Sequence, residues 1–161
     1  YGNSRVQIER PRRSHLRAQL TVSPIKSIRL RSRLEFSFFS ANESGPRHPP
    51  QLGAFISQDL RWRPNDIWSL QTCCSFFDAP SYETRFYQFE NDLPGVMRLK
   101  MLSGRGKRSY FLLSCKFSQQ LKVHFKYENT WFDDAESIGS GNDIVLRPRE
   151  NSLSCQLEWR F

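Results

Sequence analysis

The chain has 161 residues, a formal net charge of +8 and only 38% hydrophobic residues, with a mean hydropathy of -0.62. No run approaches the roughly 20 apolar residues that a membrane-spanning helix needs, which excludes helical membrane proteins. A transmembrane β-barrel stays compatible with these values, because half of each barrel strand faces water. Tyr1 to Arg13 contains no apolar signal-peptide core, so we expect Tyr1 to be a mature or truncated start.

Nine segments alternate apolar and polar side chains with a period of two. This period is typical of a strand that has an apolar environment on one face and a polar environment on the other. In chain order they are 16–22, 28–38, 52–62, 68–76, 84–90, 97–101, 110–117, 121–127 and 153–161. The facing of 84–90 is not decided by its sequence. Residues 5–10, with Val6 and Ile8 in phase, are a candidate tenth strand.

Short turns and longer polar loops alternate between these segments. The short turns are Ser23–Ser27, Pro64–Asp66, Asn91–Pro94 and Ser118–Gln120, and the longer loops are Ser40–Gln51, Asp78–Glu83, Ser103–Arg108 and Asn129–Ser152. This alternation is typical of an up-and-down barrel, whereas a sandwich mixes the two lengths because some strands cross between sheets.

The sequence therefore predicts an all-β protein, an antiparallel up-and-down transmembrane β-barrel. We expect residues 1–161 to be its C-terminal part, with about nine or ten strands visible. Single-chain bacterial barrels have even strand counts, so either the tenth strand belongs to the barrel or upstream strands complete it.

The chain end and the short turns must lie on one side, which we predict to be the periplasmic side of the cell outer membrane. Trp62, Trp68 and Trp159 then form a periplasmic aromatic girdle on the apolar face. Leu157, Trp159 and Phe161 are candidates for the signal that the barrel-assembly machinery reads. The other expected partners are outer-membrane lipid, lipopolysaccharide and further subunits of an outer-membrane complex.

Five blocks carry a resemblance to a known family. They are Phe55–Leu60 followed by Arg63 and Pro64, then Phe77–Asp92, Gly104–Tyr110, Ile138–Gly141 and Gln156–Phe161. From about Gly53 to Phe161 the chain resembles the C-terminal barrel region of Bacteroidota outer-membrane proteins that carry helix-hairpin-helix repeats earlier in the chain. The resemblance implies an outer-membrane location and a barrel completed by upstream strands. It implies contact with nucleic acid only through an upstream domain, because no helix-hairpin-helix repeat lies in this sequence.

The strand phases place a marked excess of basic side chains in the lumen. The candidates for lumenal anion binding are Arg29, Arg31, Arg33, Arg61, Arg63, Lys122 and Lys126. The most specific candidates are Arg29, Arg31 and Arg33, because their alternate spacing places three guanidinium groups on one face of the strand, about 7 Å apart. The alternatives are cross-strand ion pairs with a plug domain that compensates the remaining charge, or contacts with lipopolysaccharide.

The sequence offers no set of residues typical of catalysis. The four cysteines have neither zinc nor redox spacing, and His124 lies between lysines midway along a strand. We predict no catalytic residue, metal or cofactor, and a non-enzymatic outer-membrane barrel that serves as membrane anchor, conduit or component of a larger complex. The alternative is a soluble secreted β-protein that binds an anionic glycan or nucleic acid. An outer-membrane hydrolase that depends on His124 or His48 is a third reading.

Overall fold

The computed structural model describes residues 12–40, 49–133 and 148–161, which form strands, turns and one short 3-10 turn. The strands are β1 (Arg12–Ile25), β2 (Ile28–Ser40), β3 (Gln51–Trp62), β4 (Trp68–Ala79), β5 (Phe86–Glu90), β6 (Arg98–Leu102), β7 (Gly104–Lys116), β8 (Leu121–Phe132) and β9 (Arg149–Trp159), and the 3-10 turn η1 covers Tyr82–Thr84. The predicted all-β class is confirmed. The candidate strand at 5–10 lies outside the described residues.

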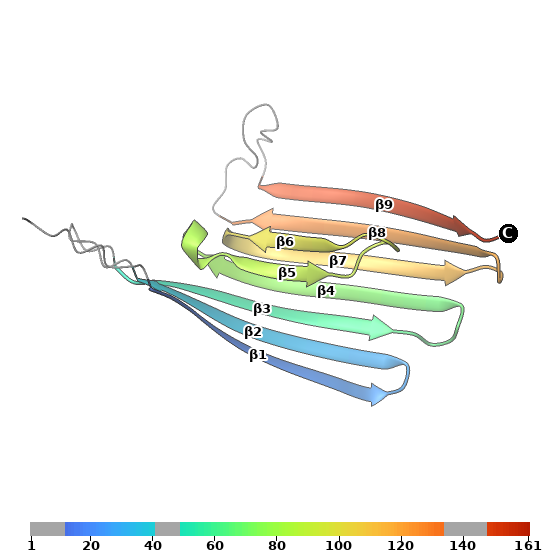
Figure 1. Ribbon diagram of the computed structural model, residues 1–161, viewed down its shortest axis with the longest axis horizontal. Helices are drawn as coiled ribbons and strands as arrows, with labels where there is room; N and C mark the ends of the chain where they lie inside the picture. The colour runs from blue at the N-terminus through green and yellow to red at the C-terminus, as the bar shows by residue number, and fades with distance from the viewer. Residues whose placement is uncertain (1–11, 41–48, 134–147) are drawn as a thin grey trace, which may run out of the picture.

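Seven strands form one antiparallel sheet in the order β1-β2-β3-β4-β7-β8-β9. Each strand pairs with the one before it in this order, so the predicted up-and-down arrangement is confirmed (Figure 1). The short connections and the C-terminus lie at one end of the sheet, which we call the turn end, and the strand ends between which the longer connections run lie at the opposite end, which we call the loop end. Within the described residues β1 and β9 are both edge strands, and the sheet is not closed.

The prediction that 84–90 and 97–101 are spanning strands of the same sheet is wrong. They are β5 and β6, five residues each, and they form a separate two-stranded sheet. β4 pairs directly with β7 from Trp68 to Ala79, which places residues 80–103 in a single connection at the loop end. Asn91–Pro94 is therefore the tip of an inserted hairpin and not a turn at the sheet edge. We call residues 80–103 the inserted hairpin.

The predicted loop at Ser103–Arg108 is also wrong, because β7 begins at Gly104. The outward side chains of this part of the sheet are charged, so the sequence shows no alternation of apolar and polar residues there. Backbone pairing continues regardless, and Arg105 of β7 forms an ion pair with Asp78 of β4 at 2.7 Å.

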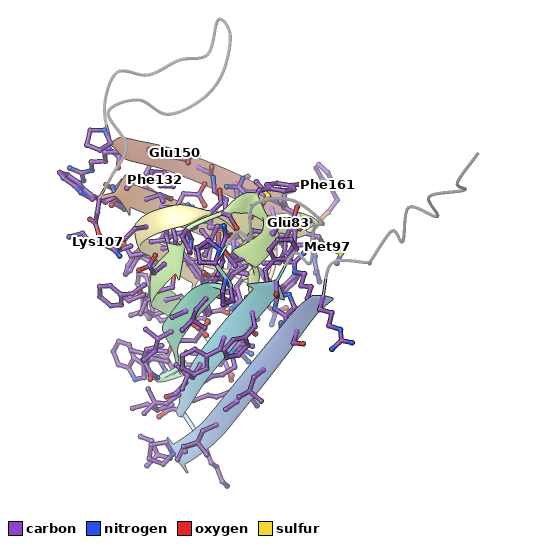
Figure 2. The ribbon with its side chains drawn as sticks, turned by 90° about the vertical axis from the view of Figure 1, so that its left-hand side faces the viewer. Glu83, Met97, Lys107, Phe132, Glu150 and Phe161 are labelled. Carbon is purple, nitrogen blue, oxygen red and sulfur yellow. The ribbon has the colours of Figure 1, made fainter. Side chains whose placement is uncertain are left out.

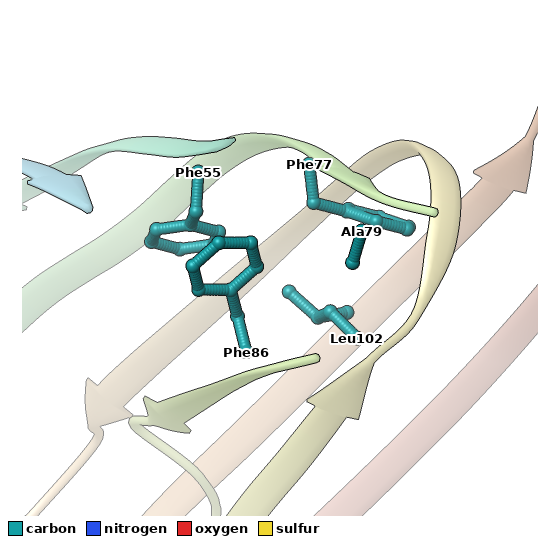
Figure 3. Packing of buried hydrophobic residues seen from close by; sticks show 5 residues of the cluster. All are labelled: Phe55, Phe77, Ala79, Phe86 and Leu102. Atoms are coloured by element: carbon teal, nitrogen blue, oxygen red, sulfur yellow. The ribbon is translucent and has the colours of Figure 1, made fainter. Parts of the chain in front are cut away.

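The hydrophobic core lies between the sheet and the inserted hairpin. Phe55, Phe77 and Ala79 of the sheet pack with Phe86 and Leu102 of the hairpin (Figure 3). The ring centroids of Phe55 and Phe86 are 5.5 Å apart. We call this face of the sheet the inner face and the opposite one the outer face.

Two glycines permit close approach of backbone at the loop end. A Cβ added at Gly53 of β3 would lie 2.9 Å from the carbonyl oxygen of Thr84, and one added at Gly106 of β7 would lie 2.2 Å from the carbonyl oxygen of Trp131. Glycine at position 53 therefore lets η1 lie directly on the sheet. This contact fixes where the chain turns from β4 onto the inner face.

Candidate functional site on the inner face of the sheet

The inserted hairpin, which includes Glu83 and Met97, lies over the inner face (Figure 2), and its side chains and backbone contact all seven strands. Its polar contacts reach from Arg13 of β1, which donates to the carbonyl of Arg85 at 3.2 Å, to Glu150 of β9, which accepts from Lys100 at 3.0 Å. Ser75 of β4 donates to Gln88 of β5 at 3.0 Å. The inner face is therefore occupied over its loop-end half, and the inserted hairpin fixes the relative positions of strands that lie far apart in the sheet.

A buried cluster of three cations and three carboxylates holds the hairpin to β7 and β8. Arg108 donates to both carboxylate oxygens of Glu90, at 2.5 and 2.8 Å, and to Glu128 at 3.0 Å. Lys126 donates to Asp92 at 2.8 Å, and Arg98 forms ion pairs with Asp92 and Glu128. The cluster is balanced in charge, and apart from Arg98 its side chains are at most 7% exposed.

Sequence reasoning placed Lys126 correctly on the inner face but missed its partners. Glu90 and Asp92 were assigned to a spanning strand and a turn, and Arg108 to a loop. The available signal was the pairing of Lys126 and Glu128 on one face of one strand, since a buried charge needs a partner of opposite sign. Lys126 is enclosed by carboxylates, so it is not a free anion-binding group.

The predicted arginine triplet of β2 divides into two kinds of environment. Arg31 donates to both oxygens of Asp59, at 3.1 and 3.0 Å. Arg33 donates to Glu35 at 2.7 Å and lies over the ring of Phe55. Both are thus paired with carboxylates. Only the Arg31–Asp59 pair joins two strands, as the cross-strand alternative requires, whereas Arg33 and Glu35 lie on the same strand. Of the triplet, only Arg29 has no side-chain hydrogen bond or ion pair in the part of the chain that the structure describes.

Arg29 belongs to a set of basic side chains near the turn end that have no such partner among residues 12–40, 49–133 and 148–161. The members are Lys26, Arg29, Arg61, Arg63, Lys116, Lys122 and Arg160. Four of the predicted anion-binding candidates, Arg29, Arg61, Arg63 and Lys122, are in this set. The structure therefore separates the seven candidates into three that carboxylates neutralise and four that they do not.

His124 of β8 is positioned by its neighbours on β7 and β9. Its Nδ1 lies 2.8 Å from the hydroxyl of Ser114, and its Nε2 lies 3.7 Å from Glu158. A serine hydrolase uses the opposite order, with Nε2 on the nucleophile and Nδ1 on the acid. This arrangement gives the hydrolase alternative no support. The described residues contain no group of three or more potential metal ligands.

The outer face carries a wide belt of exposed apolar side chains. Trp62, Trp68 and Trp159 lie at its turn-end border, with exposed fractions of 43%, 43% and 54%. Leu157 and Phe161 are also exposed, so the residues of the predicted assembly signal and girdle share one surface. No helix among the described residues is long and apolar enough to cross a membrane.

The belt runs obliquely across the strands. On β1 to β3 the belt extends past the row of directly paired residues Ala18, Leu34 and Ile56 toward the loop end, where Leu16, Phe38 and Leu52 are exposed. The same row passes through Phe76 of β4 and reaches a cation, Lys107, on β7. The same row ends at Arg149 on β9, with Trp131 between the two cations. At the turn-end border, the row through Trp62 meets β9 at Cys155, and the apolar residues of that segment continue to Phe161. The belt is thus shifted toward the turn end from β3 to β9.

Comparison of the chain with protein-family models, with characterised proteins and with solved structures finds no match. The resemblance to outer-membrane proteins with helix-hairpin-helix repeats therefore stays a prediction.

Proposed function

We propose that this chain is part of an outer-membrane β-barrel, that its outer face contacts lipid and that its inner face borders the lumen. The observation that carries the proposal is the position of the core. The buried aromatic residues and ion pairs lie on the inner face, while the large apolar side chains of the outer face are uncovered. Monomeric soluble proteins rarely leave so wide an apolar surface exposed.

The slope of the apolar belt supports a membrane setting. The turn-end border of the belt lies at Trp62 on β3 and at Phe161 on β9. The β9 residue in the same cross-strand row as Trp62 is Cys155, so the border is shifted along the strand by about six residues, or roughly 20 Å at 3.4 Å per residue. The four strand spacings between β3 and β9 amount to roughly 19 Å. A belt that is level in a bilayer would then require strands tilted by about 45°, close to the 35–45° of outer-membrane barrels.

The orientation follows from the belt and the connections. We place the turn end on the periplasmic side, where Trp62, Trp68 and Trp159 would form the interfacial girdle. Phe161 and Leu157 would be read there by the barrel-assembly machinery. The long connections would face outward, in reach of lipopolysaccharide and of other subunits of an outer-membrane complex. Contact with nucleic acid is proposed only for a region upstream of these residues.

Within such a barrel the inserted hairpin would act as an internal plug. It contacts all seven strands, and its buried cluster is balanced in charge, so it is attached firmly to the wall. A lumen narrowed in this way is better suited to a membrane anchor or complex component than to a wide conduit. We therefore favour a non-enzymatic anchoring role over open passage.

Spin labelling at two neighbouring positions of β4 tests the lipid contact. In a chain whose only cysteine is Cys74, a nitroxide on the outer face should collide often with oxygen and rarely with a water-soluble nickel chelate. The matched chain has Cys74→Ser and Gln71→Cys, which moves the label to the inner face, where the nickel chelate should have access. Both chains are reconstituted in phosphatidylcholine vesicles.

The soluble alternative gives a different pattern. A secreted β-protein that binds a glycan or nucleic acid would cover the outer face with a second protein layer. The label at Cys74 would then be shielded from both oxygen and nickel, and the protein would stay dispersed without detergent. Either result would rule out the membrane assignment.

A further inference from the structure

The inner face divides into a neutralised half toward the loop end and a cationic half toward the turn end. The neutralised half holds the buried cluster around Arg108 and the Arg31–Asp59 and Arg33–Glu35 pairs. Toward the turn end, Lys26, Arg29, Arg61 and Arg63 have no side-chain ion pair or hydrogen bond to any other described residue. On β2 and β3 the inner face thus changes from paired to unpaired cations within two residues, from Arg31 to Arg29 and from Asp59 to Arg61.

The four unpaired cations converge on one hollow. Arg29 of β2 and Arg61 of β3 are directly opposite in the strand register. The backbone N–H of Arg63 donates to the carbonyl of Ser27 at 2.7 Å, which brings Arg63 beside the turn that carries Lys26. The hollow has a volume of about 200 Å³ and is lined by Ser23, Lys26, Ser27, Ile28, Arg29, Arg61 and Arg63. No carboxylate is among these lining residues.

A bound anion would relieve the repulsion between these cations. Like charges directly opposite on neighbouring strands repel each other, and here two further cations add to the repulsion. Guanidinium groups are planar forks that donate two parallel hydrogen bonds to a phosphate or carboxylate group. The hydroxyl groups of Ser23 and Ser27 line the same hollow and provide neutral donors.

We propose that Lys26, Arg29, Arg61 and Arg63 form a binding site for an oxyanion of the phosphate class with more than one negative charge. A water molecule occupies about 30 Å³ in the liquid, so the hollow has room for an anion of several heavy atoms. Arg29 and Arg61 hold the anion from two adjacent strands, and Lys26 and Arg63 close the turn end of the site.

The anion has two candidate sources that share this chemistry, a soluble phosphate compound and the headgroup of a phospholipid. The site lies on the inner face, opposite the apolar belt, and it opens toward the turn end. This position favours a soluble anion that approaches from the turn end. The proposal goes beyond the barrel assignment and does not depend on it, because the hollow is built from β1–β3 and their turns alone.

Calorimetric titration of the full chain with sodium pyrophosphate at low ionic strength tests the site. We expect saturable binding, weakened roughly tenfold or more in the variant Arg29→Gln/Arg61→Gln, because two charged donors are lost. The control variant, Lys116→Gln/Lys122→Gln, removes the same charge from β7 and β8 and should change the affinity less than about threefold. The conservative variant Arg29→Lys/Arg61→Lys should bind with intermediate affinity, since charge is kept and the fork is lost.

A second titration with short-chain phosphatidic acid identifies the source. Tighter binding of pyrophosphate supports the soluble anion, and tighter binding of phosphatidic acid assigns the same site to a headgroup. Equal losses in the two double variants would mean nonspecific attraction to a basic surface and would overturn the proposal. Absence of binding to either probe, with circular dichroism unchanged between the variants, would overturn it as well.

Discussion

Replacement of Arg108 by methionine should release the inserted hairpin from the sheet. Arg108 is 2% exposed and is the only described partner that donates to both oxygens of Glu90, a carboxylate with no exposed surface. Loss of one member of a buried ion pair costs about 3–5 kcal/mol when its partner is left uncompensated. Here Glu90 would keep, among the described residues, only the longer contact with Lys126, at 3.8 Å. Because each 1.36 kcal/mol is a factor of ten, the open population should rise roughly 150- to 5,000-fold.

The protein has a built-in reporter for this release. Cys73 of β4 is 1% exposed and lies beneath the hairpin, where Gln88 Nε2 donates to its Sγ at 3.1 Å. A water-soluble thiol reagent reaches Cys73 only when the hairpin opens. When closing is faster than labelling, the reaction rate follows the open population. The assay is the rate of Cys73 modification in a chain whose other three cysteines are serine.

Two further variants separate this mechanism from a general loss of stability. Lys100→Gln breaks an exposed ion pair of the same hairpin with Glu150 and should raise the labelling rate less than about fivefold. Combining Arg108→Met with Glu90→Leu removes both buried charges and should restore much of the protection. If Arg108→Met left the rate of Cys73 labelling unchanged, the reasoning about the buried cluster would be refuted.

Three other outcomes follow from the same contacts. Phe86→Ala removes a fully buried ring from the core between hairpin and sheet, should cost about 3–5 kcal/mol, and should make residues 80–103 sensitive to protease; an equally resistant variant would contradict this. Burial raises the pKa of Asp92, but the hydrogen bonds from Lys126 and the backbone of Leu93 outweigh it and hold that pKa below its usual value. The stabilisation from Asp92 is therefore complete above the usual carboxyl pKa and is lost as the pH falls through the lowered one. Hydrogen exchange in β5 and β6, corrected for intrinsic rates, should accelerate in strong acid. Asp92→Asn should weaken this dependence and leave the part that comes from Glu128, a carboxylate whose charged form Arg108, Lys126 and Arg98 also stabilise. Deletion of Phe161 should lower the yield of membrane-inserted protein far more than Cys115→Ala, and equal yields would count against the assembly signal.

The facing of the strands in the main sheet could be predicted from the sequence because each of them alternates strongly. Leu153, Leu157 and Trp159 lie on the outer face, and Ser154 and Glu158 lie on the inner face, as the period of two required. The antiparallel up-and-down pairing of the other strands was also predicted from the alternating lengths of the connections, but the direct pairing of β4 with β7 was not. Strand facing and connection length depend on residues that are close together in the chain, so a single sequence is enough to predict them.

The inserted hairpin was mistaken for spanning strands, because residues 97–101 alternate as regularly as a spanning strand does. Leu99 and Met101 have the spacing of outward residues, yet they lie on the hairpin side that faces away from the sheet. Strand length was the discriminating signal, since five residues are too few to cross a bilayer. The ion-pair partners of Arg31 and Arg33 could not be predicted from the sequence either, because they depend on the register between strands and on burial.

The polarity of the inserted hairpin bears on the choice between a barrel and a soluble sheet. Its charged face is turned to the wall, and its free face carries Tyr87, Phe89, Leu99 and Met101, all at least 40% exposed. The sheet therefore has an apolar belt on its outer face and an apolar hairpin surface on the other side. A soluble sandwich would need two separate protein layers to cover both. Closure in a membrane places lipid on the belt and encloses the hairpin within the barrel, so a single event covers both surfaces, and this is why we favour it.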